Sequence, residues 1–228
     1  MIQSKLKSSG YYFAKIDPYI EILDDNMISI NYKIDLGEKS KIGKISFIGD
    51  KIFKNRKLRS IIISEEYKFW KFISGKKFLQ EELIEMDKRL LKNFYLNKGY
   101  YNVEINTSFA KLIKKNEFEL IFNIKPFQKI FFGDMKFILP KDFDEENYKD
   151  LNMLLKDLKG KPYSIFSVDK ILNEIDSITT SEEFQSSNAF AQEIIISDKL
   201  NIDFIVEKGP TFLSKELTYL EIMLHEKM

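Results

Sequence analysis

The sequence contains no cysteine and only one histidine, His225. Without cysteine there is no disulfide scaffold, no thiolate zinc site and no thiol nucleophile. A single histidine also argues against a histidine-based metal cluster or a Ser-His-Asp triad. No glycine pattern of the kind that cradles phosphates surrounds Gly99 or Gly160. We therefore expect a protein that is not an enzyme and has no cofactor, no metal and no small-molecule substrate.

An excess of charge of one sign is also missing. The formal net charge is +1, from 36 Lys and Arg against 35 Asp and Glu. Nucleic-acid-binding domains usually carry a basic excess, so we expect no nucleic-acid partner. Only three of the 36 basic residues are arginine, a bias that we attribute to AT-rich codons and not to a binding surface.

Long apolar runs are absent as well, and the longest are short, such as Ile61–Ile63 and Ile130–Phe132. A membrane-spanning helix needs about 20 apolar residues. No charged-then-apolar secretion signal follows Met1. Residues 2–7 resemble the last turns of an amphipathic helix, so we expect this chain to be a fragment of a longer protein.

What the sequence does contain is an internal repeat. The string Gly10–Tyr12 recurs as Gly99–Tyr101, 89 residues later. Four further pairs recur in the same order at offsets between 82 and 90: Ile30–Asp35 with Leu120–Lys125, Leu120–Lys125 with Ile202–Glu207, Gly75–Phe78 with Gly160–Tyr163, and Gly43–Phe47 with Gly133–Phe137. Five ordered matches predict a repeated domain of that size.

The middle copy predicts the order β-α-α-β-β. A β-rich run at 42–48 precedes a short helix capped by Asn55 and a loop from Glu65 to Gly75. A second helix follows, with an expected apolar face of Leu79, Leu83, Met86, Leu90 and Phe94. Acidic residues on that helix, Glu81, Glu82, Glu85 and Asp87, are interpreted as its solvent face. Two alternating strands, 103–109 and 118–124, end the copy.

The next copy repeats this order. A strand is expected at 131–139, then a helix that begins near Asp142–Glu146 and stops at Gly160. The acidic start is interpreted as helix capping in preference to a cation site. Ser167 is expected to cap the second helix, and strands at 190–196 and 200–206 form a hairpin.

These copies divide the chain into four parts. Residues 1–38 are expected to end one domain, and 39–126 and 127–209 to be complete domains. The tail, 210–228, lacks the strand that should open a further copy. We interpret it as the frameshifted start of such a domain, without a function of its own.

The residues that repeat resemble those of a known family. The string Ile42–Asp50, the loop with Trp70, the helix residues Asp87 to Tyr95 and the Gly99–Tyr100 pair are similar to POTRA domains of the Omp85 family. The resemblance covers about residues 1–210 and is to the third and fourth POTRA domains of the family's outer-membrane assembly factors, with the end of the second. It implies an α+β fold: tandem β-α-α-β-β domains, each a three-stranded mixed sheet with two helices on one face. The third strand would be central and the second at an edge.

The family also implies a function. Its assembly members carry periplasmic POTRA domains before a β-barrel in the outer membrane. Those domains bind accessory assembly lipoproteins and receive unfolded β-barrel proteins for insertion. The expected location is therefore the periplasm, as part of an outer-membrane protein. The alternative is the POTRA region of another Omp85 member, a TamA-like protein or a two-partner secretion transporter.

An edge strand suggests how such a domain binds clients without catalytic residues. Its unpaired backbone groups can pair with an extended peptide. The candidate edge is 101–109, with Tyr101, Val103, Ile105, Thr107 and Phe109 as site residues, and 190–196 is its counterpart. The alternative is that the strand only buries Val103 and Ile105 beneath the helices.

Two further sets of residues are candidates. Trp70 and Phe72 could anchor a partner, since aromatic residues dominate binding hot spots. The favoured alternative is that Trp70 packs as a lid on a small core. Gly43, Gly49, Gly99 and Tyr100 are expected to serve the backbone and core of the domain.

Overall fold

The computed structural model describes residues 1–23, 27–49, 52–70, 75–114, 116–141, 143–181 and 187–208, and the side chains of these except 109–114 and 181. Phe72 and the tail 210–228 lie outside this set, as does the side chain of Phe109. The chain divides into two compact units, with the division after Gln128. Within the described residues, no helix is both long and apolar enough to cross a membrane.

Unit 1 begins with a short helix and a hairpin. These are α1 (Ile2–Ser8), β1 (Lys15–Ile22) and β2 (Ile28–Asp35), and the two strands pair antiparallel. The rest of the unit follows in the order β3 (Lys41–Ile48), α2 (Asn55–Arg59), a 3₁₀ turn (Gly75–Lys77), α3 (Glu81–Leu96), β4 (Glu104–Lys114) and β5 (Glu117–Lys125).

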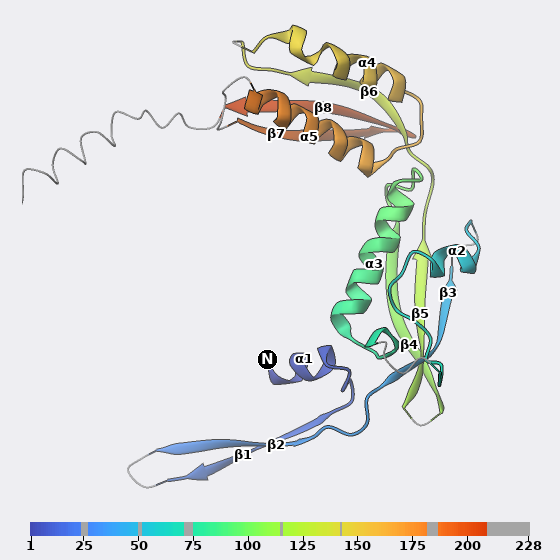
Figure 1. Cartoon of the computed structure of the whole chain (residues 1–228), viewed down its shortest axis with the longest axis vertical. Helices are drawn as coiled ribbons and strands as arrows, with labels where there is room; N and C mark the ends of the chain where they lie inside the picture. The colour runs from blue at the N-terminus through green and yellow to red at the C-terminus, as the bar shows by residue number, and fades with distance from the viewer. Residues whose placement is uncertain are drawn as a thin grey trace, which may run out of the picture. The chain divides into compact units, whose positions relative to one another are not determined.

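The sheet of unit 1 has the strand order β3-β5-β4 (Figure 1). β3 runs parallel to β5, and β4 runs antiparallel to it. The expected mixed sheet is confirmed, with the third strand of the copy at the centre and the second at an edge. One register shift lies between Ile42 and Lys44, so Gly43 sits at a β-bulge.

Helix α3 packs on this sheet with a different face from the expected one. Its buried residues are Ile84, Asp87, Leu91, Tyr95 and Leu96, whereas Met86 is exposed. The predicted helical spacing is confirmed, but the buried stripe is rotated by about one residue. Asp87, interpreted as a surface residue, is fully buried. Leu120, Phe122 and Ile124 of β5 complete the core below the helix.

Two glycines fix how strands and helix end. Gly99 closes α3 with φ of 92°, where Tyr100 N–H bonds to the carbonyl of Tyr95. Tyr100 is itself buried, and its ring contacts that of Tyr95. Gly49 follows β3 with φ of 84°, and a Cβ there would lie 2.5 Å from the carbonyl oxygen of Ile124. A side chain at position 49 would thus separate β3 from the central strand.

Unit 2 repeats the fold. Its elements are β6 (Phe131–Ile138), a 3₁₀ turn (Glu145–Tyr148), α4 (Lys149–Leu158), α5 (Ile165–Ser181), β7 (Ser187–Ile196) and β8 (Lys199–Lys208). The strand order is β6-β8-β7, again with a parallel and an antiparallel pair. Helices α4 and α5 cover one face, where Leu151, Leu155, Ile171 and Ile175 are buried (Figure 1).

The expected helix caps are corrected at two places. Asn55 is the first residue of α2, and Lys54 precedes it without a side-chain cap. In unit 2 the side chain of Ser164, and not Ser167, accepts the N–H at the start of α5. Asp144 caps its turn by accepting the N–H of Glu146, so the expected capping role is confirmed for this residue of the acidic start.

Candidate functional site: the edges of the two sheets

Strand β4 forms an edge of the unit 1 sheet. It begins at Glu104, so the expected interval of 101–109 started too early. Tyr101 lies in a turn before the strand, and Val103 N–H bonds to the carbonyl of Tyr100. These residues still belong to the turn that follows α3 and are therefore not part of the strand. Val103 is buried, and Ile105 and Thr107 are half-buried on the helix side of the sheet.

The outward backbone groups of β4 follow from the hairpin geometry. Lys114 and Glu117 are the last pair of the β4–β5 hairpin, with two residues between them. In a pair that closes a hairpin of this length, the two residues hydrogen-bond to each other through their backbones. The backbone groups of the odd-numbered residues of β5 therefore point toward β4. Those of the even-numbered residues point the other way, as the carbonyl of Asn116 does when it accepts the N–H of Lys41. The β4 partners of those odd residues are Glu104, Asn106, Ser108 and Ala110. The N–H and C=O groups of Ile105 and Thr107 consequently point away from the sheet.

Strand β7 repeats this arrangement in unit 2. Ile196 and Lys199 close a two-residue loop, and the register continues without a bulge to Ser187. By the same alternation, Ala189, Ala191 and Ile195 direct their backbone groups outward. Among the described residues, no other strand pairs with the outer edge of β4 or of β7. Along the described residues, neither expected edge is paired with a further strand.

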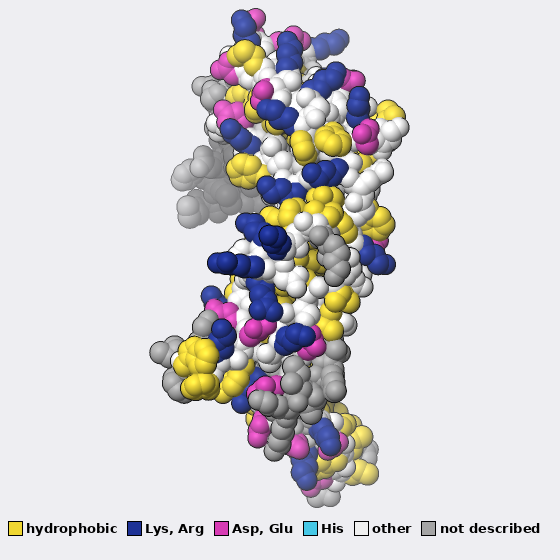
Figure 2. Space-filling model, turned by 90° about the vertical axis from the view of Figure 1, so that its right-hand side faces the viewer, with side chains coloured by type: hydrophobic (Ala, Val, Ile, Leu, Met, Phe, Trp, Pro, Cys, Tyr) yellow, Lys and Arg dark blue, Asp and Glu magenta, His cyan; other side chains and the backbone are white. Residues whose placement is uncertain are grey.

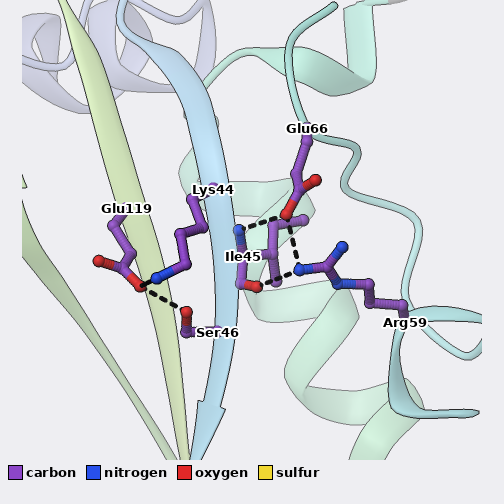
Figure 3. Close-up of polar contacts among 6 residues, drawn as sticks. All are labelled: Lys44, Ile45, Ser46, Arg59, Glu66 and Glu119. Atoms are coloured by element: carbon purple, nitrogen blue, oxygen red, sulfur yellow. Dashed lines mark hydrogen bonds and ion pairs between the residues drawn. The ribbon is translucent and has the colours of Figure 1, made fainter. Parts of the chain in front are cut away.

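The opposite edge of the unit 1 sheet is closed by side chains (Figure 3). Ile45 N–H donates to the Glu66 carboxylate at 3.0 Å, and Arg59 donates to the Ile45 carbonyl at 2.7 Å. Arg59 and Glu66 are themselves paired at 2.7 Å. This ion pair occupies the positions that an added strand would fill with its own C=O and N–H. On the other side of β3, Glu119 of β5 binds Lys44 and Ser46 (Figure 3).

The beginning of β3 is closed by backbone. Tyr67 N–H bonds to the carbonyl of Ile42 at 2.6 Å, and Leu79 N–H bonds to that of Ser40 at 2.9 Å. In unit 2, the segment between α4 and α5 does the same for β6. Phe132 N–H donates to the carbonyl of Lys161, and Tyr163 N–H donates to the carbonyl of Ile130, each at 2.9 Å. β3 and β6 are therefore covered edges of their three-stranded sheets, at least along their first halves.

Asp87 holds the segment that closes β3. Its carboxylate accepts the N–H of Ile63 at 2.6 Å and that of Ser64 at 3.2 Å. Burial raises the pKa of Asp87, and these hydrogen bonds only partly oppose the rise. The sequence pattern does not predict this role, because a carboxylate among other acidic helix residues has the pattern of a solvent face. Its position one turn before the buried Leu91 was the only available signal.

Trp70 lies on the surface of unit 1. It is 59% exposed and makes an edge-to-face contact with the exposed Phe69, at 4.7 Å between ring centroids. The favoured expectation of a lid over the core is therefore wrong. An anchor role for Trp70 stays a prediction, and Phe72 lies outside the described residues.

The face shown in Figure 2 carries charged side chains of both signs. Lys and Arg side chains lie among Asp, Glu and hydrophobic ones in Figure 2, in keeping with the net charge of +1. Across the described part of the chain, no group of three or more His, Cys, Asp or Glu residues could hold a metal ion.

Comparison with known proteins identifies this architecture. Residues 40–126 match the POTRA family model, described as a surface antigen variable number repeat. The chain superposes on the crystal structure of Haemophilus influenzae BamA POTRA3-5 with a TM-score of 0.59 at 12% identity, over 90% of this chain and 77% of that one. Residues 40–126 thus match the POTRA family, the chain has the α+β fold of tandem POTRA structures, and the expected resemblance to the Omp85 family is confirmed.

Curated relatives narrow the resemblance to one kind of member. The outer membrane protein assembly factor BamA of Neisseria meningitidis is 24% identical over 202 residues, which is 88% of this chain and 25% of the relative. BamA of Buchnera aphidicola is 32% identical over 98 residues, 41% of this chain and 16% of the relative. The chain spans about a quarter or less of the length of these relatives.

Proposed function

We propose that this chain is the periplasmic POTRA part of a BamA-like outer-membrane protein assembly factor. In this role it binds extended segments of unfolded β-barrel proteins by strand addition, while the parent protein's own β-barrel sits in the outer membrane. Accessory assembly lipoproteins are its other proposed partners. The observation that carries the proposal is the asymmetry of the unit 1 sheet: Ile105 and Thr107 of β4 offer outward backbone, whereas β3 is closed at Ile45.

Strand addition suits clients of varied sequence. Backbone groups supply the hydrogen bonds, so the client needs an extended conformation more than particular side chains. Two outward residues provide up to four such bonds, each contributing about 1 kcal/mol net. A single edge therefore binds weakly, and the similar edge of β7 adds a second site on the same chain. Weak and exchangeable contacts fit a scaffold that passes its client on.

We propose the domain limits in the same terms. Residues 39–126 and 127–209 form complete domains, and 1–38 end a preceding one. The β2 residues Ile30 and Tyr32 align with Leu120 and Phe122 of β5 in the repeat, but they are exposed where the latter are buried. The hairpin β1–β2 thus has the apolar sheet face of a domain whose helices would cover it.

Proline substitution on β4 tests the strand-addition proposal. Thr107→Pro removes an outward N–H and should leave the sheet intact, since edge strands tolerate proline at such positions. The probe is a short synthetic peptide of alternating threonine and valine, here called the strand peptide. Titrated into the isotope-labelled full chain, it should shift the amide resonance of Ile105 in the wild type and not in the variant.

Two controls sharpen the result. Ser108→Pro removes an N–H that bonds to β5, so it should disrupt the β4–β5 ladder itself. A strand peptide with methylated backbone nitrogens lacks donors and should bind to neither protein. If Thr107→Pro folds and the unmodified peptide still perturbs Ile105 with unchanged affinity, addition at β4 is wrong.

A further inference from the structure

The ion pair between Arg59 and Glu66 is placed where a neighbouring strand would be. One Glu66 oxygen accepts the N–H of Ile45, and one Arg59 nitrogen donates to its carbonyl. An added β-strand would satisfy the same two groups with one C=O and one N–H. The two side chains thus reproduce the bonding pattern of a strand without offering a further edge.

The remainder of β3 is suited to accept a strand. The backbone N–H and C=O of Ile45 point away from β5, so by alternation those of Phe47 point away from β5 too. Among the described residues, no hydrogen-bond partner is recorded for the outward groups of Phe47. The part of β3 closed by backbone ends at Ile42, before the bulge at Gly43. From Ile45 onward, the described hydrogen bonds to the outer edge of β3 come from Arg59 and Glu66 alone.

We propose that Arg59 and Glu66 determine which edge of this sheet accepts a strand: they close β3 at Ile45 and so confine addition to β4. The partner is an extended peptide, the same class as in the proposed function, on which this inference builds. The Arg59 and Glu66 side chains are 44% and 24% exposed. A pair this accessible contributes little to stability, so its placement serves to exclude a strand, as inward charges do at other sheet edges.

Confinement to one edge has a consequence for the client. β3 and β4 flank β5 on opposite sides, and β4 runs antiparallel to both β5 and β3. A client strand that could join either edge would bind in two places and in opposed orientations relative to the domain. With β3 closed, one domain presents one edge to the client.

The double variant Arg59→Ala/Glu66→Ala tests the inference in the full chain. Hydrogen exchange of the Ile45 and Phe47 amides is measured by NMR, with and without the strand peptide. We expect at least a tenfold slowing of both amides by the peptide in the double variant, and no slowing at Phe47 in the wild type. Protection at these two amides supports the inference whether or not β4 binds.

Two matched variants separate the edge effect from loss of charge. Glu85→Ala/Lys88→Ala removes an ion pair of similar length, 2.9 Å, from the surface of α3, and should leave β3 closed. Arg59→Lys/Glu66→Gln keeps a donor and an acceptor at Ile45 and should also stay closed. Circular dichroism verifies that each variant is folded.

The outcomes distinguish the two proposals. If the peptide protects Ile105 but never Ile45 and Phe47 in the folded double variant, the role of the ion pair is overturned and the function of β4 stands. If it protects Ile45 and Phe47 but never Ile105, the proposed function at β4 fails and the closure of β3 stands. If no amide is protected in any variant, both are overturned.

Discussion

The carboxylate of Asp87 on α3 accepts the backbone N–H of Ile63 at 2.6 Å. Through this bond a buried charge fixes the start of the segment that runs along β3. Glu66 follows three residues later and reaches Ile45, and Tyr67 reaches Ile42. The closed edge of the sheet therefore depends on a helix residue that never contacts the edge.

Replacing Asp87 by alanine should destabilise unit 1 by about 2–4 kcal/mol, because it leaves the buried N–H of Ser64 and the partly buried N–H of Ile63 without acceptors. The measurement is the free energy of unfolding from the urea dependence of hydrogen exchange at Leu120 and Phe122. The exchange of the Ile45 amide should also accelerate, since Glu66 loses its fixed approach. Glu85→Ala, an exposed acidic residue on the same helix, should change stability by less than about 0.5 kcal/mol. Equal effects of the two variants would contradict this role of Asp87.

Stability should depend on pH through Asp87 with an unusual sign. Burial raises the pKa of Asp87 in the folded chain, so the folded state binds this proton more tightly than the unfolded state. The stability that this proton contributes is fully present below the unfolded pKa of Asp87, about 3.9, and is lost as the pH rises through the folded pKa. Asp87→Asn should remove this loss. The free energy of unfolding of both proteins, measured across acidic pH, shows whether their difference changes in this direction.

Glu119 provides the opposite case within the same sheet. Hydrogen bonds from Lys44 and Ser46 lower the pKa of Glu119. Its contribution to stability is present above the unfolded pKa of about 4.3 and is lost as the pH falls through the folded pKa. Glu119→Gln is therefore the control that must shift the pH profile the other way.

Gly49→Ala should cost about 2–4 kcal/mol, from a left-handed backbone and a Cβ 2.5 Å from the Ile124 carbonyl. Gly37 also has a positive φ, of 59°, but nothing lies within 4 Å of its Cβ position. Gly37→Ala should therefore cost at most about 1–2 kcal/mol. Urea unfolding of the two variants compares them directly, and equal costs would show that the contact with Ile124 is relieved by movement of β3.

The order of strands was predictable from the sequence because it is encoded locally and repeated. Alternation in 118–124 and in 200–206 marks the central strands, and the glycine at 99 marks a helix end. The closure of β3 could not be read in this way. It requires Arg59 and Glu66 to approach Ile45, and each of these side chains by itself has the pattern of an ordinary surface residue. Contacts between side chain and backbone across 14 and 21 residues leave no periodic trace.

The prediction that Trp70 packs over the core is wrong for a related reason. An aromatic residue in a small domain is usually needed in the core, but Phe53, Tyr95 and Tyr100 already contact one another there. Trp70→Ala should accordingly change the free energy of unfolding by less than about 0.5 kcal/mol, whereas Tyr95→Ala should cost about 3–5 kcal/mol. Trp70 is the only tryptophan, so its fluorescence should be strongly quenched by iodide in the folded chain. Protection from iodide would contradict its exposure.

Unit 2 allows the assignment of outward backbone to be tested without any ligand. In β7, Ala191 directs its N–H outward and Gln192 bonds to Asp203 of the central strand. Ala191→Pro should leave unit 2 folded, while Gln192→Pro removes a ladder bond, brings its ring against β8 and should cost about 3 kcal/mol or more. The two residues are neighbours, so local sequence preference is nearly the same for both. Hydrogen exchange at Ile202 and Phe204 measures each cost. If Ala191→Pro is the more damaging substitution, the alternation is shifted by one residue, and the outward positions of β7 are the even-numbered residues.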